Sequence, residues 1–103
     1  MRSIHMPYIK QDQREGLDDA IETLAAQIQN LSQGDLDQAA GMVNYSCTRL
    51  VLRVVKLSGK KFNYATLALM TGVFSNIQSE FYRRKGAPYE DLKVAENGDL
   101  DWD

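Results

Sequence analysis

Apolar residues recur at three- and four-residue steps along three stretches of this chain, and that spacing is the feature that most limits its fold. The stretches cover residues 11–32, 42–57 and 63–85. Apolar side chains with this spacing share one face of an α-helix, and that face has to be buried against another helix. Because the polar breaks between the stretches are short, consecutive helices are expected to run antiparallel. The sequence therefore predicts an all-α fold, a three-helix antiparallel bundle.

Each predicted helix has its own stripe of core candidates. The stripes consist of Leu17, Ile21, Leu24, Ala25, Ile28 and Leu31, then Val43, Cys47, Leu50, Val51, Val54 and Leu57, and finally Tyr64, Leu67, Thr71, Phe74, Ile77, Gln78 and Phe81. Cys47 is the only cysteine, and its place in the second stripe predicts a small buried hydrophobe rather than a reactive thiol. A strand over residues 50–55 is the alternative, because this run is rich in β-branched valine.

The first two helices have recognisable end signals. Asp12 is a candidate N-cap for the first helix. Gly34 suits a left-handed C-cap, and Asp35 suits the N-cap of the segment that follows. Gly41 weakens a helix by about 1 kcal/mol, so a kink or break is expected there before the second helix.

The third helix is also bounded by particular residues. Asn63 is its candidate cap, and Gly86 and Pro88 are expected to end it. With 103 residues the chain is predicted to be a single domain. An extended leader, residues 1–10, precedes the helices, and an acidic tail, residues 87–103, follows them.

Charge is strongly segregated along the chain. Residues 41–86 carry eight Lys or Arg and one acid, Glu80, which gives +7, whereas residues 1–40 carry −4 and residues 87–103 carry −5. The basic centre therefore requires a counter-charge from elsewhere. A nucleic-acid groove is disfavoured, because acids outnumber bases overall and the pI is about 5.3.

The hydropathy pattern bears on location. No apolar run approaches the ~20 residues that a membrane-spanning helix needs. Residues 1–10 mix charged and apolar side chains and so lack an apolar signal core. A cytoplasmic location, without membrane attachment, is expected.

Arginine and tyrosine side chains at helical spacing form a candidate ligand site. An arginine fork binds phosphate bidentately, and a tyrosine supplies a hydroxyl group and a stacking face. These properties suit a non-catalytic protein that binds an anionic ligand such as a nucleotide. The candidate residues are Tyr45, Arg49 and Arg53 on the second predicted helix, and Tyr82, Arg83 and Arg84 on the third.

The alternative is a structural or interaction module in which these charges are neutralised internally. In that case Arg49 pairs with Glu80, and the arginines at positions 83 and 84 hold Glu90 and Asp91 after Pro88 turns the chain back. The same residues are as compatible with folding as with ligand binding.

A third hypothesis is a magnesium-dependent all-α nucleotide pyrophosphohydrolase. Such enzymes hold metal between acidic clusters on facing helices. The first helix offers Glu15, Asp18, Asp19 and Glu22, which are otherwise expected to form a solvated face. The facing cluster is missing, because the other two helices supply only Glu80. With one histidine, His5, and no glycine-rich phosphate loop, no catalytic residue, metal site or cofactor is expected.

Four short motifs give the chain a family resemblance. They read NYSCTRL at 44–50, EFYRR at 80–84, PYEDLK at 88–93 and ENGD at 96–99. From Met6 onward the chain resembles a family of small, uncharacterised helical proteins of phages and prophage-bearing bacteria. The resemblance implies an all-α fold and a viral or mobile-element context, with no activity to transfer.

In that context the chain is expected to be an accessory or counter-defence factor in the host cytoplasm. It would sequester an anionic small molecule, such as a signalling nucleotide, or engage a host protein. Self-association into a homo-oligomer is also expected, because a small chain with segregated charges gains stability by pairing.

Overall fold

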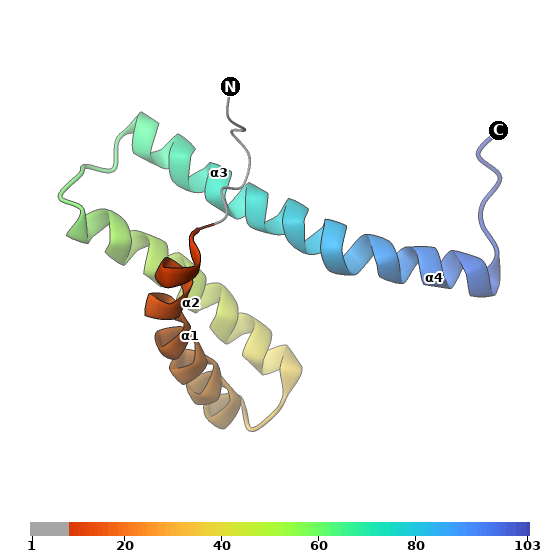
Figure 1. The fold of residues 1–103 in the computed structure, drawn as a ribbon, viewed down its shortest axis with the longest axis horizontal. Coiled ribbons are helices and arrows are strands. Elements are labelled where there is room, and N and C mark those ends of the chain that lie inside the picture. Colours follow the sequence, from red (N-terminus) through yellow and green to blue (C-terminus); the bar gives the residue numbers. More distant parts are fainter. Residues whose placement is uncertain (1–8) are drawn as a thin grey trace. The chain divides into compact units, whose positions relative to one another are not determined.

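The computed structural model describes residues 9–103, which form α-helices joined by short loops (Figure 1). The elements are α1 (Gln11–Ser32), α2 (Leu36–Leu57), α3 (Tyr64–Phe81), the π-helical turn η1 (Tyr82–Gly86) and α4 (Ala87–Asn97). No strand occurs in this part of the chain. The prediction of an all-α chain with three main helices is confirmed, and the strand alternative at residues 50–55 is wrong. The predicted leader lies outside the described residues, except for Ile9 and Lys10, which are not helical.

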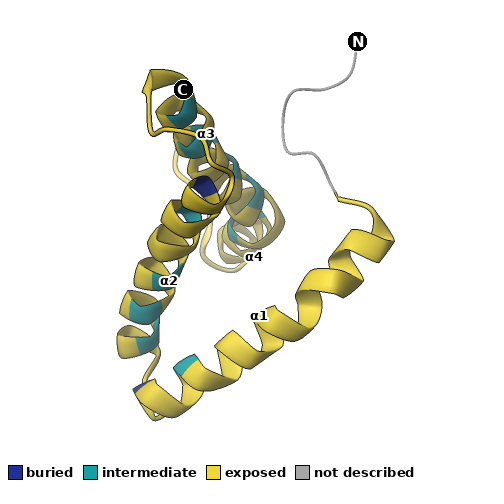
Figure 2. Cartoon of the chain, turned by 90° about the vertical axis from the view of Figure 1, so that its left-hand side faces the viewer, coloured by how far each residue is buried: buried dark blue, intermediate teal, exposed yellow. Residues whose placement is uncertain are grey.

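Helices α1 and α2 form an antiparallel hairpin around a tight turn (Figures 1 and 2). Gln33 ends α1 in the left-handed conformation with φ 53°, and Gly34 follows with φ 78°. The Asp35 carboxylate then accepts a hydrogen bond from the Asp37 N–H at 3.0 Å. Asp35 is therefore the N-cap of α2, as predicted, whereas the C-cap of α1 is Gln33, one residue before the predicted Gly34.

Helix α1 begins at Gln11, two residues earlier than a cap at Asp12 would allow. The Lys10 N–H donates to Gln13 Oε1 at 3.0 Å, and Arg14 Nε donates to the Ile9 carbonyl at 3.1 Å. Asp12 lies inside the first turn, where its carboxylate accepts from the adjacent Gln13 N–H. The assignment of Asp12 as N-cap is wrong, although an acid in the first turn still favours the helix dipole.

The predicted break at Gly41 is also wrong, because α2 begins at Leu36 and runs through Gly41 without interruption. Nothing lies within 4 Å of the position that a Gly41 side chain would take. The intrinsic cost of one helical glycine, about 1 kcal/mol, is outweighed by the helix that continues on both sides.

Helix α3 starts as predicted but does not stop at the predicted signals. The Asn63 side chain caps its start by accepting from the Thr66 N–H at 3.0 Å. At the other end the chain widens into η1, where the Ala87 N–H donates to the Tyr82 carbonyl, and Pro88 enters the first turn of α4. Proline is tolerated in a first helical turn, because its missing N–H is not needed there. The acidic tail is therefore helical as far as Asn97, and only residues 98–103 are non-helical.

Most of the predicted core residues are exposed (Figure 2). Val55 is the buried apolar residue of the described part of the chain, with 5% of its surface exposed. Leu31 and Phe81 are each 69% exposed, and the Cys47 thiol is exposed rather than buried as predicted. The chain divides into two compact units, Met1–Thr66 and Leu67–Asp103. In each unit, many large apolar side chains of the helices are exposed.

Replacing Gly41 with Ala should raise the free energy of unfolding by about 0.5–1 kcal/mol, because the site is helical and the added methyl group meets nothing. The matched change Gly34→Ala should lower it by about 1 kcal/mol, because Gly34 has φ 78°. Urea denaturation followed by circular dichroism measures both changes. Destabilisation by the Gly41 change would show that α2 is not continuous there.

Candidate anion-binding site

A surface cavity of about 440 Å³ lies at the C-terminal end of α2 and along the loop that follows it. Its lining combines basic and apolar side chains and contains no acidic one. The basic residues are Arg49, Arg53, Lys56 and Lys60, and the apolar residues are Leu52, Val55 and Phe62. The cavity belongs entirely to the unit that contains α1 and α2.

Helical spacing and one pinned loop bring these residues together. Arg49, Arg53 and Lys56 follow one another at four- and three-residue steps, so they share one side of α2. The Ser58 hydroxyl then donates to the Val55 carbonyl at 2.6 Å and accepts from the Lys60 N–H at 3.2 Å. Together with Gly59, which has φ 77°, these bonds turn the chain back toward the helix.

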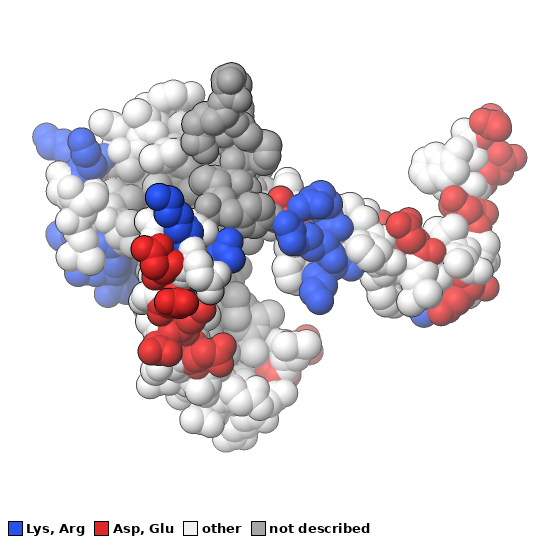
Figure 3. Space-filling model, in the orientation of Figure 1, with Lys and Arg blue, Asp and Glu red and all other residues white. Residues whose placement is uncertain are grey.

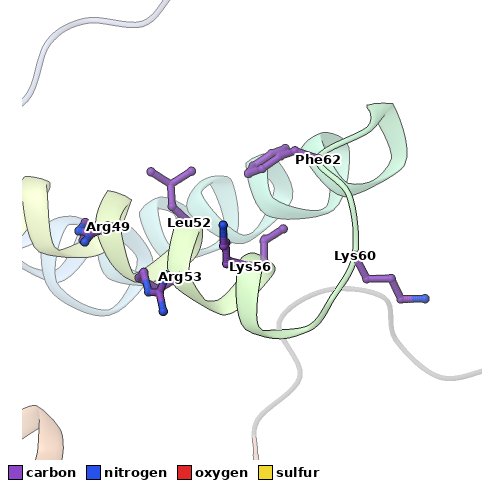
Figure 4. Close-up of a pocket in the computed structure, with 7 residues that line it drawn as sticks. Arg49, Leu52, Arg53, Lys56, Lys60 and Phe62 are labelled. Carbon is purple, nitrogen blue, oxygen red and sulfur yellow. The ribbon is translucent and has the colours of Figure 1, made fainter.

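The apolar residues form the floor of the cavity. Val55 is buried, and the Phe62 ring is 48% exposed. Leu52 and Lys56 project from α2 on the side where Phe62 lies, whereas Lys60 extends away from the helix (Figure 4). A ligand in this cavity would therefore meet an apolar surface and a cationic rim at once.

Among residues 9–103, the four basic side chains of the cavity have no carboxylate partner. No Asp or Glu occurs between Asp37 and Glu80 in the sequence. The ion pairs among residues 9–103 join Glu80 to Arg83 and Arg84, and Lys93 to Glu96, and none involves the cavity. Like charges one helical turn apart repel each other. An anion bound between them would relieve that repulsion.

Two of the six predicted ligand residues, Arg49 and Arg53, line this cavity. Tyr45 lines a different hollow, between α1 and α2, beside Leu24 and Ile28. Sequence reasoning missed Lys56, Lys60 and Phe62 as members of the site. Lys56 continues the spacing of the two arginines and could have been found, whereas the two loop residues depend on the turn at Gly59.

The other predicted ligand residues lie in the unit that contains residues 67–103. Glu80 Oε1 accepts from Arg83 Nη2 at 2.9 Å and from Arg84 Nε at 3.0 Å. The hydrogen bonds from Arg84 and then Arg83, with their positive charges, lower the pKa of the half-buried Glu80 carboxyl. Both arginines are thus engaged by Glu80, because helical spacing of three and four residues favours this acid. Their hypothesised pairing with Glu90 and Asp91 stays a prediction.

Tyr82 has a structural setting in the same unit. Its hydroxyl donates a hydrogen bond to Glu90, and its ring lies against Gly86. A side chain at Gly86 would approach a ring carbon of Tyr82 to 2.5 Å, so glycine is needed for this packing. The hydrogen bond to Glu90 and the charge of that carboxylate raise the pKa of the Tyr82 phenol. The proposed pair of Arg49 with Glu80 stays a prediction.

The residues of the magnesium hypothesis lie on α1, where acidic side chains gather (Figure 3). Glu15, Asp18, Asp19 and Glu22 are all exposed. Over residues 9–103, no three or more His, Cys, Asp and Glu side chains are placed so that they could hold a metal ion. Over the same range, none of the helices has the length and apolarity that a bilayer crossing requires.

Comparison with known proteins gives a family and no activity. A family model with the description "Domain of unknown function (DUF6899)" matches residues 6–100, which is nearly the whole chain. No curated protein and no solved structure matches the chain.

Tyr82 should titrate at higher pH than an ordinary tyrosine, whose pKa is 10.0. Because the pKa of Tyr82 is raised in the folded state, its hydrogen bond to Glu90 contributes fully to the free energy of unfolding below pH 10.0. This contribution is lost as the pH rises through the raised pKa. Glu90→Gln should lower the Tyr82 pKa by removing the carboxylate charge. Alkaline titration followed by ultraviolet absorbance measures the pKa of Tyr82, and the Tyr82→Phe variant shows which part of the absorbance change belongs to this phenol. Coincident titrations of the parent and the Glu90 variant would contradict the assigned hydrogen bond.

Proposed function

We propose, for this chain that belongs to the DUF6899 family, a non-catalytic protein that binds a phosphate-bearing small molecule of the nucleotide class. The description of the family assigns no activity, so the proposal is argued from the cavity. The observation that carries this proposal is the cluster of four basic side chains, without carboxylate partners among the described residues, around an apolar floor.

The size and chemistry of the cavity support a nucleotide. Its volume, about 440 Å³, is within the range of roughly 300–1,000 Å³ typical of small-molecule sites. Arg49 and Arg53 supply planar forks suited to phosphate oxygens, and Lys56 adds a point charge. The half-exposed ring of Phe62 offers a face on which a base could stack.

The composition of the lining favours binding without turnover. None of the seven lining residues is a carboxylate, a histidine, a serine or a cysteine, the groups most often used for proton transfer and nucleophilic attack. In the phage or prophage context that the sequence resemblance implies, such a protein would act as an accessory or counter-defence factor. It would lower the free concentration of a host signalling nucleotide.

A structural or interaction module is the second candidate, and the ion pairs of the other unit favour it. There Glu80 neutralises Arg83 and Arg84 within one helical stretch. A host protein with an acidic segment would also be attracted to the cavity cations. If Arg49→Ala abolishes folding instead of ligand binding, the module is the better description.

Arg53→Ala should weaken binding of a nucleoside triphosphate by about 10- to 100-fold, because a charge-assisted bond to phosphate contributes roughly 1.5–3 kcal/mol. Lys61→Ala is the matched control, since Lys61 follows Lys60 but does not line the cavity, and it should bind nearly as the parent does. Isothermal titration at low and high salt measures both, and affinity should fall with salt. Equal losses in the two variants, or no binding by the parent at low salt, would refute the proposal.

Phe62→Ala separates recognition of the base from recognition of phosphate. Loss of a base–aromatic stack contributing roughly 1–3 kcal/mol should weaken binding of the triphosphate by about 5- to 100-fold. Binding of inorganic pyrophosphate, which has no base, should be unchanged. A parallel loss for both ligands would mean that Phe62 shapes the loop and does not contact a base.

A further inference from the structure

The segment after α4 has a composition that complements the cavity. Residues 99–103 read Asp-Leu-Asp-Trp-Asp, so acidic and apolar residues alternate. The segment is non-helical and exposed, with 78% of the Trp102 surface accessible. The Asp99 carboxylate accepts from Trp102 Nε1 at 3.3 Å, which is a local contact only. Acidic side chains predominate over α4 and this segment (Figure 3).

In extended conformation, alternation would place the three carboxylates on one side and Leu100 and Trp102 on the other. The cavity presents the matching pair of surfaces, a rim of four cations and an apolar floor with Phe62. The segment therefore combines three negative charges with one large aromatic ring, and both match the described lining of the cavity.

The length of the helical stretch decides which copy of the segment can reach the cavity. Elements α3, η1 and α4 follow one another without interruption from Tyr64 to Asn97, 34 residues that span about 51 Å at 1.5 Å per residue. The stretch begins two residues after Phe62, at the edge of the cavity. Residues 98–103, fully extended, span at most about 20 Å. Because the helical stretch is longer than the reach of the segment, the inference assigns the segment to a second copy of the chain.

We propose that residues 98–103 of a second copy occupy the cavity, with Trp102 against Phe62 and the aspartates against the cationic rim. A pair of copies that exchange these segments reciprocally forms a closed two-fold dimer. The inference rests on the same cavity as the proposed function but does not require a nucleotide. A nucleotide that binds there would displace the segment and release the two copies.

Sedimentation of the full chain at low salt, without added anions, tests the exchange. The parent should associate above its monomer mass of 11.6 kDa. Asp101→Asn/Asp103→Asn, and separately Trp102→Ala, should weaken association at least about tenfold, because each removes contacts of the kind that contribute more than 1 kcal/mol. The matched control Asp18→Asn/Asp19→Asn removes the same charge from α1 and should associate as the parent does. A parent that stays monomeric, or tail variants that associate unchanged, would overturn the proposal.

A charge exchange between two variants makes the test independent of folding. Arg53→Glu and Asp101→Arg/Asp103→Arg should each associate more weakly than the parent when alone. Mixed in equal amounts, they should recover part of the association, because the unchanged segment of the Arg53→Glu variant then meets the unchanged cavity of the other variant. No recovery in the mixture, with both variants helical by circular dichroism, would contradict the exchange.

The two proposals fail separately. If the mixture recovers but nucleotides neither bind nor dissociate the parent dimer, the exchange stands and the proposed ligand is wrong. If nucleotides bind a parent that is monomeric at every concentration, the ligand stands and the exchange is wrong.

Discussion

The site depends on a run of 42 residues, 38–79, that contains five basic residues and no acidic one. A helix usually neutralises a cation with an acid three or four positions away. The other unit does this twice, where Glu80 bridges Arg83 and Arg84 and where Lys93 meets Glu96. Helix α2 has no such acid after Asp37, so its own segment does not neutralise its arginines. In the proposed function, a bound anion supplies the missing negative charge.

The positive charge of the cavity would attract any anion. The apolar residues of its floor restrict the class of ligand that suits it. Leu52, Val55 and Phe62 lie among the cations, so a bound group that offers only charge leaves apolar surface exposed to water. The Ser58 hydroxyl holds the loop to the end of α2 by two hydrogen bonds, which fixes the aromatic ring relative to the helix. A preformed loop lowers the ordering cost of binding. For this reason the ligand that we propose is both anionic and aromatic or apolar.

The sequence predicted the elements better than their ends. The extent of α1 follows from apolar spacing, although neither of its predicted caps is the observed one. The cap at Asn63 was predicted correctly because its signal is local. The predicted breaks at Gly41, Gly86 and Pro88 are wrong, because the effect of each residue on a helix is small or is compensated by its surroundings. A π turn places Pro88 where no donor is needed, and the ring of Tyr82 packs against Gly86. Such compensation depends on contacts between turns, which local propensity does not contain.

The same reasoning explains which site residues could be predicted. Arg49 and Arg53 follow from helical spacing, but Phe62 enters the cavity only because the loop turns back at Gly59. Burial was harder to predict than the site residues. The apolar stripe that contains Cys47 has the correct helical period, but Cys47 is exposed in the described part of the chain. Periodicity says which side chains share a face and not what covers that face.

A nucleotide and the segment around Trp102 are chemically alike, since each joins a planar aromatic group to several negative charges. A cavity with a ring on its floor and cations on its rim does not distinguish strongly between them by type of contact. Under the proposed exchange, concentration and linkage distinguish them, because the segment would be carried by another copy of the chain whereas the small molecule diffuses freely. Binding of the small molecule and association of the chain are then linked equilibria, and each must weaken the other by the same factor. One cavity would thus couple the amount of ligand to the number of free copies.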